Sequence, residues 1–375
     1  MKALKILEIL VAFPTVSSSS NLDLMAWVAG YLDRYGVKSH LVPNEDGTKT
    51  NLYATIGPAT AGGIILSGHT DVVPVEGQDW HSAPFETVIK DGRVYGRGTC
   101  DMKGFLAIVL AAVPAMVAAD LKRPIHLAFP YDEEVGCLGA PPLIAELVKV
   151  LPPVDAVFVG EPTSMKVIEN HKGMVTGSVM ITGRDAHSSM PHLGVDANLA
   201  AHHWMSEILK LGASLASKRQ PGSTFEPPIS TTNIGVLSGG NAVNIVAGKC
   251  HIGWSLRVMP TDDAAEIIAE IQRATAKVDF ALKAQDGNCG ATLVIHTEVP
   301  SFKVEPTPTA ANLCRSFTGE NNKDQVVSFA TEAGQFQLAG YSVAVCGPGS
   351  IEQAHKPNEF IALSEMDRCA EFLTM

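Results

Sequence analysis

Short apolar segments of the β type recur through the first 160 residues, and helical stretches accompany them; this alternation constrains the fold more than any other feature of the sequence. The β-type segments are rich in Ile, Val and Leu and comprise residues 51–56, 63–66, 125–129 and 156–159. The helical stretches comprise residues 4–11, 22–35, 103–119 and 139–150. This pattern is typical of a largely parallel sheet covered on both faces, so we expect an α/β fold here.

A different order of elements begins at Gly173. The sequence predicts a strand over 173–182, a helix over 195–211, β-type runs over 231–237 and 243–258, a helix over 262–279 and a strand over 290–297. This order resembles a ferredoxin-like βαββαβ unit. The α/β pattern then returns, with a strand over 341–346 and a helix over 361–373. We therefore expect a first domain split over 1–172 and 298–375, with an α+β domain inserted over 173–297.

The balance of charge excludes two classes of partner. The chain has 28 Lys and Arg against 39 Asp and Glu, which gives a net charge of −11. Such an acidic chain has no basic surface for nucleic acid or for an anionic membrane. The longest apolar run, 105–119, is shorter than the roughly 20 residues of a membrane span, and no signal peptide is apparent. We expect a cytoplasmic protein with no nucleic-acid or membrane partner.

The cysteines constrain the chemistry of any metal site. All seven are widely spaced and none forms a C-x-x-C pair, which argues against a disulfide framework and against a thiolate zinc site. If a metal binds, its ligands are oxygen and nitrogen atoms.

Carboxylates and imidazoles follow the predicted strands of the first domain. These residues are His69, Asp71, Asp101, Glu133, Glu134, Glu161 and His355. Taken singly, a histidine at a strand end is more often a structural hydrogen-bonding group, and an acidic triplet such as 132–134 is usually a solvated turn. Ligands of open α/β sheets bind beyond the carboxyl ends of the strands, so these groups are expected to converge. Unpaired buried charges are costly, and the cluster therefore predicts a compensating pair of divalent cations.

The formal charges favour two ions over one. Asp101, Glu134 and Glu161 together carry −3 against +4 for two zinc ions, and one bridging hydroxide would neutralise the remainder. His69 and His355 then complete the ligand set as neutral imidazoles.

Two further acidic residues receive roles from their position in the sequence. Asp71 lies two residues after His69 in an extended segment, so its carboxylate is expected to accept the other ring N–H of His69. Glu133 is adjacent to Glu134 and would point elsewhere, which makes it the best candidate for the general base.

The chain as a whole resembles a family of dinuclear zinc metallopeptidases and deacylases, which includes acetylornithine deacetylases, succinyl-diaminopimelate desuccinylases, aminoacylases and glutamate carboxypeptidases. The motifs that carry the resemblance are SGHTDVVP (67–74), YGRGTCDMKG (95–104), YDEEVGC (131–137), GEPT (160–163), AHSSMPHLGVDAN (186–198) and GPGSIEQAHKPNEF (347–360). Within the family, HKG (171–173) and TEAGQFQ (331–337) are most similar to the deacetylase branch.

The resemblance implies a role for each residue of the cluster. Asp101 would bridge two Zn²⁺ ions, for which Co²⁺ is a possible substitute, and a cis peptide would follow it. His69 and Glu161 would complete one ion site, and Glu134 and His355 the other. Glu133 would be the base.

The resemblance also implies substrate contacts and a partner. His187 would reach the substrate carbonyl across a homodimer formed by the inserted lid domain, although a surface histidine is the alternative. Arg257 and Asn244 would bind the substrate carboxylate, and a structural salt bridge is an equal alternative for Arg257. Gly347 and Ser350 would line the substrate site.

The function that follows is hydrolysis of an amide through a zinc-activated water. The first expectation is removal of the acetyl group from N2-acetyl-L-ornithine, a step of arginine biosynthesis. A desuccinylase or a broader N-acyl-L-amino-acid amidohydrolase is the alternative. A metal-free binding protein would require lost ligands, and a serine hydrolase would require a G-x-S-x-G motif, which the chain lacks.

Overall fold

The computed structural model describes residues 1–319 and 325–374, which form two compact units. Unit 1 comprises Met1–Asn170, Phe302–Val326 and Thr331–Met375, and unit 2 comprises His171–Ser301 and Val327–Ala330. Unit 1 is thus built from segments on both sides of unit 2. The short segment Val327–Ala330 groups with unit 2, whereas the sequence analysis assigns it to the split domain.

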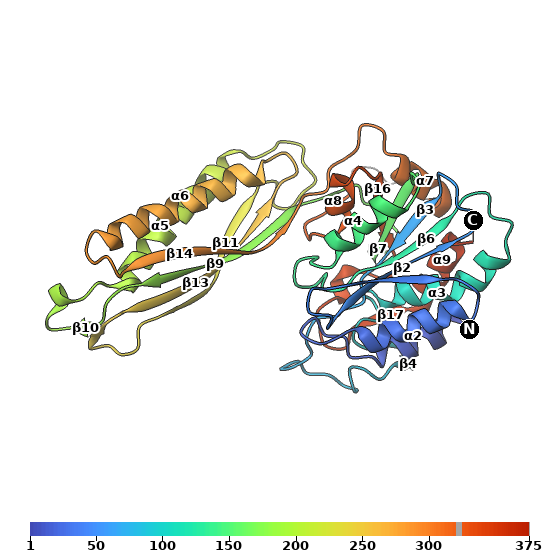
Figure 1. The fold of residues 1–375 in the computed structure, drawn as a ribbon, viewed down its shortest axis with the longest axis horizontal. Helices are drawn as coiled ribbons and strands as arrows, with labels where there is room; N and C mark the ends of the chain where they lie inside the picture. The colour runs from blue at the N-terminus through green and yellow to red at the C-terminus, as the bar shows by residue number, and fades with distance from the viewer. Residues whose placement is uncertain (320–324, 375) are drawn as a thin grey trace. The chain divides into compact units, whose positions relative to one another are not determined.

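Unit 1 contains a central sheet of six strands, drawn in Figure 1. Their spatial order is β1 (Ser39–Pro43), β2 (Thr50–Ile56), β6 (Ile125–Phe129), β3 (Ile64–Ser67), β7 (Ala156–Pro162) and β16 (Val343–Gly347). The last four strands run parallel, and β1 and β2 add an antiparallel edge. The predicted α/β class with a mostly parallel sheet is confirmed.

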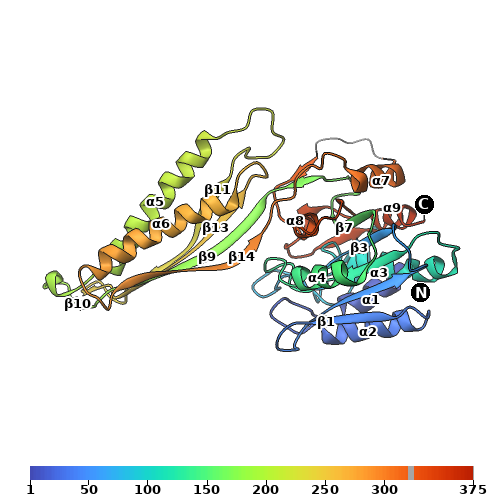
Figure 2. The same ribbon diagram turned by 45° about the horizontal axis from the view of Figure 1, so that its top comes forward.

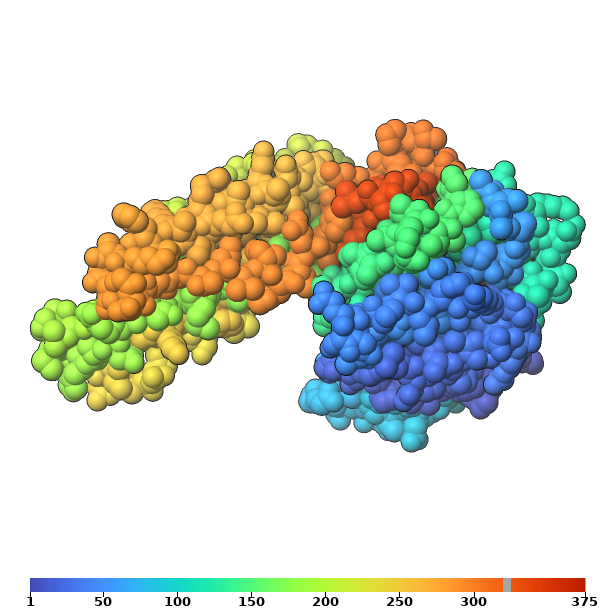
Figure 3. Space-filling view, in the orientation of Figure 1, coloured from blue at the N-terminus to red at the C-terminus, as the bar shows by residue number. Residues whose placement is uncertain are grey.

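Helices pack on both faces of this sheet. They are α1 (Ala3–Val11), α2 (Leu22–Asp33), α3 (Lys103–Ala118), α4 (Ala140–Val150), α7 (Thr309–Thr318), α8 (Ala333–Leu338) and α9 (Leu363–Phe372). Neighbouring residues of one strand point to opposite faces, and in β3 both Ile65 and Leu66 are completely buried. The main core gathers side chains of α1, α2, α3 and α9, while α8 lies against α4, as the red and green atoms of Figure 3 show. A small sheet joins β4 (Val88–Lys90), β5 (Arg93–Tyr95) and β17 (Phe360–Ala362).

Two glycines permit close packing at the carboxyl end of this sheet. A Cβ atom on Gly160 would lie 2.3 Å from the ring of Phe105 in α3, and one on Gly347 would lie 2.0 Å from the carbonyl oxygen of Gly160. Such distances are far below van der Waals contact, so only glycine fits at either position. The packing brings β7, β16 and the first turn of α3 together around Glu161.

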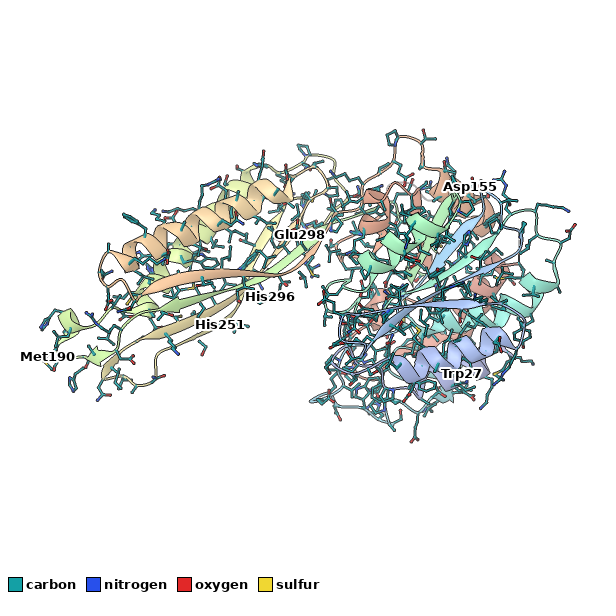
Figure 4. All side chains as sticks on the ribbon, viewed as in Figure 1. Trp27, Asp155, Met190, His251, His296 and Glu298 are labelled. Atoms are coloured by element: carbon teal, nitrogen blue, oxygen red, sulfur yellow. The ribbon has the colours of Figure 1, made fainter. Side chains whose placement is uncertain are left out.

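Unit 2 has the predicted ferredoxin-like fold. Its chain order is β9 (Gly173–Thr182), α5 (Ala197–Ser217), β11 (Thr231–Gly239), β13 (Lys249–Val258), α6 (Ala264–Lys283) and β14 (Gly290–Val299). The four strands pair antiparallel in the order β11, β13, β9, β14, and both helices lie on one face (Figure 2). A short pair of β10 (Ala186–His187) and β12 (Ile245–Val246) stands at the end that Met190 marks in Figure 4.

Alternation of burial along the strands of unit 2 fixes which face the helices cover. In β9, Val175, Gly177, Val179 and Ile181 are buried, and the residues that alternate with them are more exposed. His251 of β13 and His296 of β14 lie on the opposite face from the helices (Figure 4), where Nε2 of His296 lies 2.9 Å from Oγ of Ser178. No helix of the described residues is long and apolar enough for a membrane crossing.

The buried His126 in β6 makes the stability of unit 1 sensitive to acid. Its Nδ1 lies 2.8 Å from Oγ1 of Thr55, and its Nε2 has no hydrogen-bond partner within the described part of the chain. Burial lowers the pKa of His126 to about 4. In an unfolded chain the pKa is about 6.5, so between pH 6.5 and 4 the unfolded state binds a proton that the folded state does not. Stability is therefore lost as the pH falls through this window.

We expect this group to cost about 2 kcal/mol of unfolding free energy between pH 7 and pH 5, because one pKa unit corresponds to about 1.4 kcal/mol. In His126→Gln the loss over this range should be smaller by that amount. Urea unfolding of both proteins in a chelator, at pH 7 and pH 5, measures the difference. An equal loss in the two proteins would contradict the prediction.

Candidate metal centre

The candidate residues of unit 1 meet at the carboxyl edge of the central sheet. His69 follows β3, Glu133 and Glu134 follow β6, and Glu161 lies within β7. His355 follows β16, whereas Asp101 lies just before α3. Because β3, β6, β7 and β16 are parallel, their carboxyl ends lie at one edge, and ligands of open α/β sheets bind there.

The imidazole of His69 faces two carboxylates. Its Nε2 lies 3.0 Å from Oδ1 of Asp101 and 3.8 Å from Oε1 of Glu161, and all three side chains are buried. Its Nδ1 lies 2.9 Å from the backbone carbonyl oxygen of Asp71. A carbonyl oxygen only accepts, so Nδ1 carries the proton, and Nε2 is the atom available to a cation.

Asp101 lies between two groups of possible ligands. Its Oδ1 faces His69, and its Oδ2 lies 3.4 Å from Nε2 of His355. The same Nε2 lies 2.8 Å from Oε2 of Glu134. The two oxygens of one carboxylate therefore face different histidines, which is the arrangement that a bridging ligand requires.

Glu133 and Glu134 lie on different sides of the cluster although they are neighbours in sequence. Ligand atoms of His69, Glu133 and Glu161 lie within 4.8 Å of one another, and so do those of His69, Asp101 and Glu134. The thiol of Cys137 donates to Oε1 of Glu133 at 3.3 Å. Oε2 of Glu133 is then the oxygen that can take a proton.

The chemistry of the donor set fits divalent cations. Oε1 of Glu161 is buried and has no hydrogen-bond partner among the described residues. Burial raises the pKa of Glu134 to about 7, and it raises those of Glu133 and Glu161 well above the usual carboxyl range. Hydrogen bonds to Asp101 and Glu134 raise the pKa of His355 to about 10. The cluster thus holds more negative charge than its histidines neutralise, and a cation would replace the protons that it retains.

The carboxylate of Asp71 has a different main role from the one expected. It lies 3.5 Å from Nδ1 of His69, which instead bonds the Asp71 carbonyl. The carboxylate accepts from Oγ of Ser17 at 2.6 Å and from the backbone N–H groups of Glu133 and Glu134 at 3.0 and 3.3 Å. Asp71 therefore orients the loop that carries Glu133 and Glu134, and it also contacts the His69 ring with both its carbonyl and its carboxylate.

Further contacts hold that loop. Lys49 donates to both oxygens of Asp132 at 2.6 and 2.7 Å. Asn51 accepts from the backbone N–H of Tyr131 and donates to the carbonyl of Gly139, at 3.1 and 2.9 Å. The backbone at Asp132 is left-handed, with φ of 54°, a conformation that non-glycine residues rarely adopt. The cis peptide expected between Asp101 and Met102 is also present.

A buried glutamate beside the cluster was missed by the sequence analysis. Glu332, at the start of α8, accepts from Oγ of Ser67 at 3.1 Å, and its Oε2 has no partner within the described residues. Burial raises its pKa, and its charge in turn raises those of Glu133 and Glu161. The only signal in the sequence was its place in the motif TEAGQFQ.

The remaining candidate residues are divided between the two units. Gly347 pairs with Pro162 beside Glu161, and Ser350 accepts from the backbone N–H of Glu352 at 3.3 Å; both belong to unit 1. His187 and Asn244 belong to unit 2 and are neighbours, since the N–H of Ser188 donates to the carbonyl of Asn244 at 3.0 Å.

Arg257 also belongs to unit 2 but lies at the other end of β13. Eight residues separate it from Lys249, or about 26 Å along a strand, so the structure does not bring it together with His187 and Asn244. Burial lowers the pKa of its guanidinium. No described residue forms a hydrogen bond or ion pair with that guanidinium, so the structural salt bridge considered from the sequence is not found within 1–319 and 325–374.

The chain is similar to proteins of one enzyme family. Residues 65–375 match peptidase family M20/M25/M40. The acetylornithine deacetylase of Pasteurella multocida (strain Pm70) is 33% identical, over 99% of this chain and 96% of that protein. The M20 family metallo-carboxypeptidase Sso-CP2 from Sulfolobus solfataricus has a TM-score of 0.78 at 17% identity, over 100% of this chain and 98% of that chain. The Bacillus subtilis YXEP protein, described as a dinuclear metal binding peptidase, has a TM-score of 0.67 at 14% identity, over 99% and 95% of the two chains.

Proposed function

Because this chain belongs to peptidase family M20/M25/M40, we propose that it removes the acetyl group from N2-acetyl-L-ornithine and releases L-ornithine and acetate. Membership of the family makes the chain a hydrolase that acts on an amide bond. The observation that carries hydrolysis by a metal-activated water is the cluster in which the two oxygens of Asp101 face His69 and His355. The 33% identity to an acetylornithine deacetylase, over nearly the whole chain, supports the choice of substrate.

We assign the cluster to two Zn²⁺ ions, for which Co²⁺ could substitute. Asp101 would contact both ions, His69 and Glu161 would hold one, and Glu134 and His355 would hold the other. When bound, the ions lower the pKa of a water molecule and polarise the carbonyl of the substrate.

The protein's own contribution to the reaction is the movement of one proton. Glu133 takes a proton from the water on Oε2 while Cys137 holds Oε1. The water oxygen attacks the carbonyl carbon, and the C–N bond then breaks. Glu133 returns the proton to the departing amine. The raised pKa of Glu133, caused by burial, suits a group that must both accept and donate.

Unit 2 is proposed to supply the remaining contacts. The guanidinium of Arg257, which pairs with no described residue, would bind the substrate carboxylate, and Gly347 and Ser350 would line the site. Asn244 lies at the other end of β13, so it would contact that carboxylate from a second copy of the chain. His187 would donate to the substrate carbonyl from a second copy of the chain. The edge strand β11 supports a homodimer through unit 2, because Val236 and Leu237 on it are 53% and 56% exposed.

Steady-state kinetics of the Zn²⁺-loaded enzyme on four amides test the choice of substrate. We expect the highest kcat/KM on N-acetyl-L-ornithine, followed by N-acetyl-L-methionine and then N-succinyl-L,L-diaminopimelate. The carboxamide of the first substrate, N-acetyl-L-ornithinamide, should react on the order of 10²-fold more slowly than N-acetyl-L-ornithine, because Arg257 would lose its anionic partner. A higher kcat/KM on the succinyl compound would assign a desuccinylase, and equal values on both N-acetyl acids would assign a broader amidohydrolase.

A further inference from the structure

Glu359 is a buried carboxylate that the proposed reaction does not use. It is 1% exposed, and each of its oxygens accepts two hydrogen bonds. Oε2 accepts from Nη1 of Arg97 at 2.7 Å and from the backbone N–H of Gly98 at 3.0 Å. Oε1 accepts from the backbone N–H groups of Cys100 and Asp101, at 2.8 and 3.0 Å. Four donors thus converge on one side chain.

Three of these donors are backbone N–H groups of the loop that carries Asp101, and the fourth is the side chain of Arg97 in the same loop. The loop runs between β5 and α3, and among the described residues Glu359 is the acceptor that these N–H groups have. Without Glu359 they would be left without acceptors in the interior, which a folded chain avoids. The position of the Asp101 backbone is therefore set by the position of the Glu359 carboxylate.

The same network reaches the segment that carries His355. Nη2 of Arg97 donates to Oε1 of Gln78 at 2.6 Å, and Nε2 of Gln78 donates to the carbonyl of His355 at 3.1 Å. Nη1 of Arg97 also lies 3.3 Å from the carbonyl of Lys356. Glu359 is thus linked through Arg97 and Gln78 to the backbone on which His355 stands.

We propose that Glu359 is a positioning residue that fixes Asp101, and through Arg97 and Gln78 also His355, at the spacing that two metal ions require. The inference rests on the proposed ligand roles of Asp101 and His355. Partners of metal ligands commonly matter for affinity because they orient the ligand before the ion arrives.

A simple structural ion pair would not explain the geometry. If Glu359 served only as the ion-pair partner of Arg97, only the oxygen that faces the guanidinium, Oε2, would need to accept a hydrogen bond. Oε1 makes both of its bonds to the loop, one of them to the N–H of Asp101 itself. The ion pair and the positioning of the loop can therefore be separated by mutation.

Two double variants make this separation. Arg97→Met with Glu359→Gln removes the ion pair but keeps one oxygen for the N–H groups of Cys100 and Asp101, while the N–H of Gly98 loses its acceptor in both double variants. Arg97→Met with Glu359→Leu removes the ion pair and that oxygen. Titration of the metal-free proteins with Co²⁺, followed by visible absorption, gives both the affinity and the ligand geometry around the ion.

We expect the leucine double variant to bind Co²⁺ on the order of 10- to 100-fold more weakly than the glutamine double variant, with an altered absorption spectrum. The glutamine double variant should match the single variant Arg97→Met. Equal Co²⁺ affinities in the two double variants would overturn the proposal. Should the leucine variant not fold, Arg97→Met with Glu359→Asp replaces it, because the shorter side chain draws the carboxylate away from the N–H groups of Cys100 and Asp101. This variant should bind Co²⁺ more weakly than Arg97→Met, and equal binding would overturn the proposal.

A matched control is available in the same unit. Glu169 forms an ion pair with Arg315, and both side chains are largely buried. Glu169→Gln should leave Co²⁺ binding unchanged. If the wild-type protein itself does not bind Co²⁺, the proposed metal centre fails; normal binding in the wild type with no difference among the variants removes only the role of Glu359.

Discussion

Replacing Glu133 with Gln is expected to lower kcat by about 10²- to 10⁴-fold, because an amide cannot take the proton that the attacking water must lose. The change preserves the shape of the side chain and an oxygen that can accept from the thiol of Cys137. Metal content should therefore remain near that of the wild-type enzyme. Measurement of amine release and of bound zinc in the same preparation checks both statements.

The control for this substitution is Glu146→Gln on α4, a helix residue with an ordinary ion pair to Lys149, which should keep full activity. Activity of Glu133→Gln within tenfold of the wild type would remove Glu133 as the base. Loss of zinc in the variant would instead make Glu133 a ligand, an outcome that its place beside His69 and Glu161 makes worth testing.

The same variant tests whether His187 acts across a dimer. Glu133→Gln and His187→Ala subunits are each expected to be inactive alone. Mixed dimers would contain one site with both residues intact, and we expect up to about half of the wild-type activity per such dimer on statistical grounds. Verified mixed dimers with no recovered activity would exclude a role for His187 in trans.

The strands that could be predicted are those whose burial leaves a continuous apolar signal. β6 and β9 begin and end at the predicted residues, because both are held between other strands and carry runs or alternations of Val, Ile and Leu. Helix α7 was not predicted from the sequence. It buries only Ala310, Ala311 and Cys314, so most of its other residues are polar and no clear apolar pattern marks it. The edge strand β1 was missed for the same reason, because most of it is exposed.

The cluster of acidic and imidazole groups could be anticipated because parallel strands deliver their carboxyl ends to one edge of a sheet. The hydrogen-bond partners of those groups could not be predicted. Asp71 bonds the N–H groups of Glu133 and Glu134, and Glu359 bonds those of Cys100 and Asp101. Which backbone N–H groups lack a partner depends on the path of each loop, and no periodic pattern in the sequence records that path.

Asp101 should be the residue whose loss removes both ions. Its two oxygens face different histidines. Replacement by Asn removes the negative charge that both positions share and leaves one oxygen, so at least one position loses its Asp101 ligand. His355→Ala withdraws a ligand from only one position, where Glu134 is its neighbour at 2.8 Å. We expect Asp101→Asn to bind well under one zinc ion per chain and His355→Ala to bind about one, against about two for the wild type.

Metal analysis after dialysis and thermal unfolding with and without Zn²⁺ measure this difference. A ligand that binds only the folded state at 100 times its Kd stabilises it by about 2.7 kcal/mol, so Asp101→Asn should lose most of the rise in Tm that zinc gives the wild type. Asp155→Asn is the matched control: Asp155, labelled in Figure 4, pairs with Arg123 just before β7 begins, whereas the ligand Glu161 lies near the end of that strand. Two zinc ions retained by Asp101→Asn would mean that Asp101 does not bridge them, and the division of the cluster into two positions would then need different ligands.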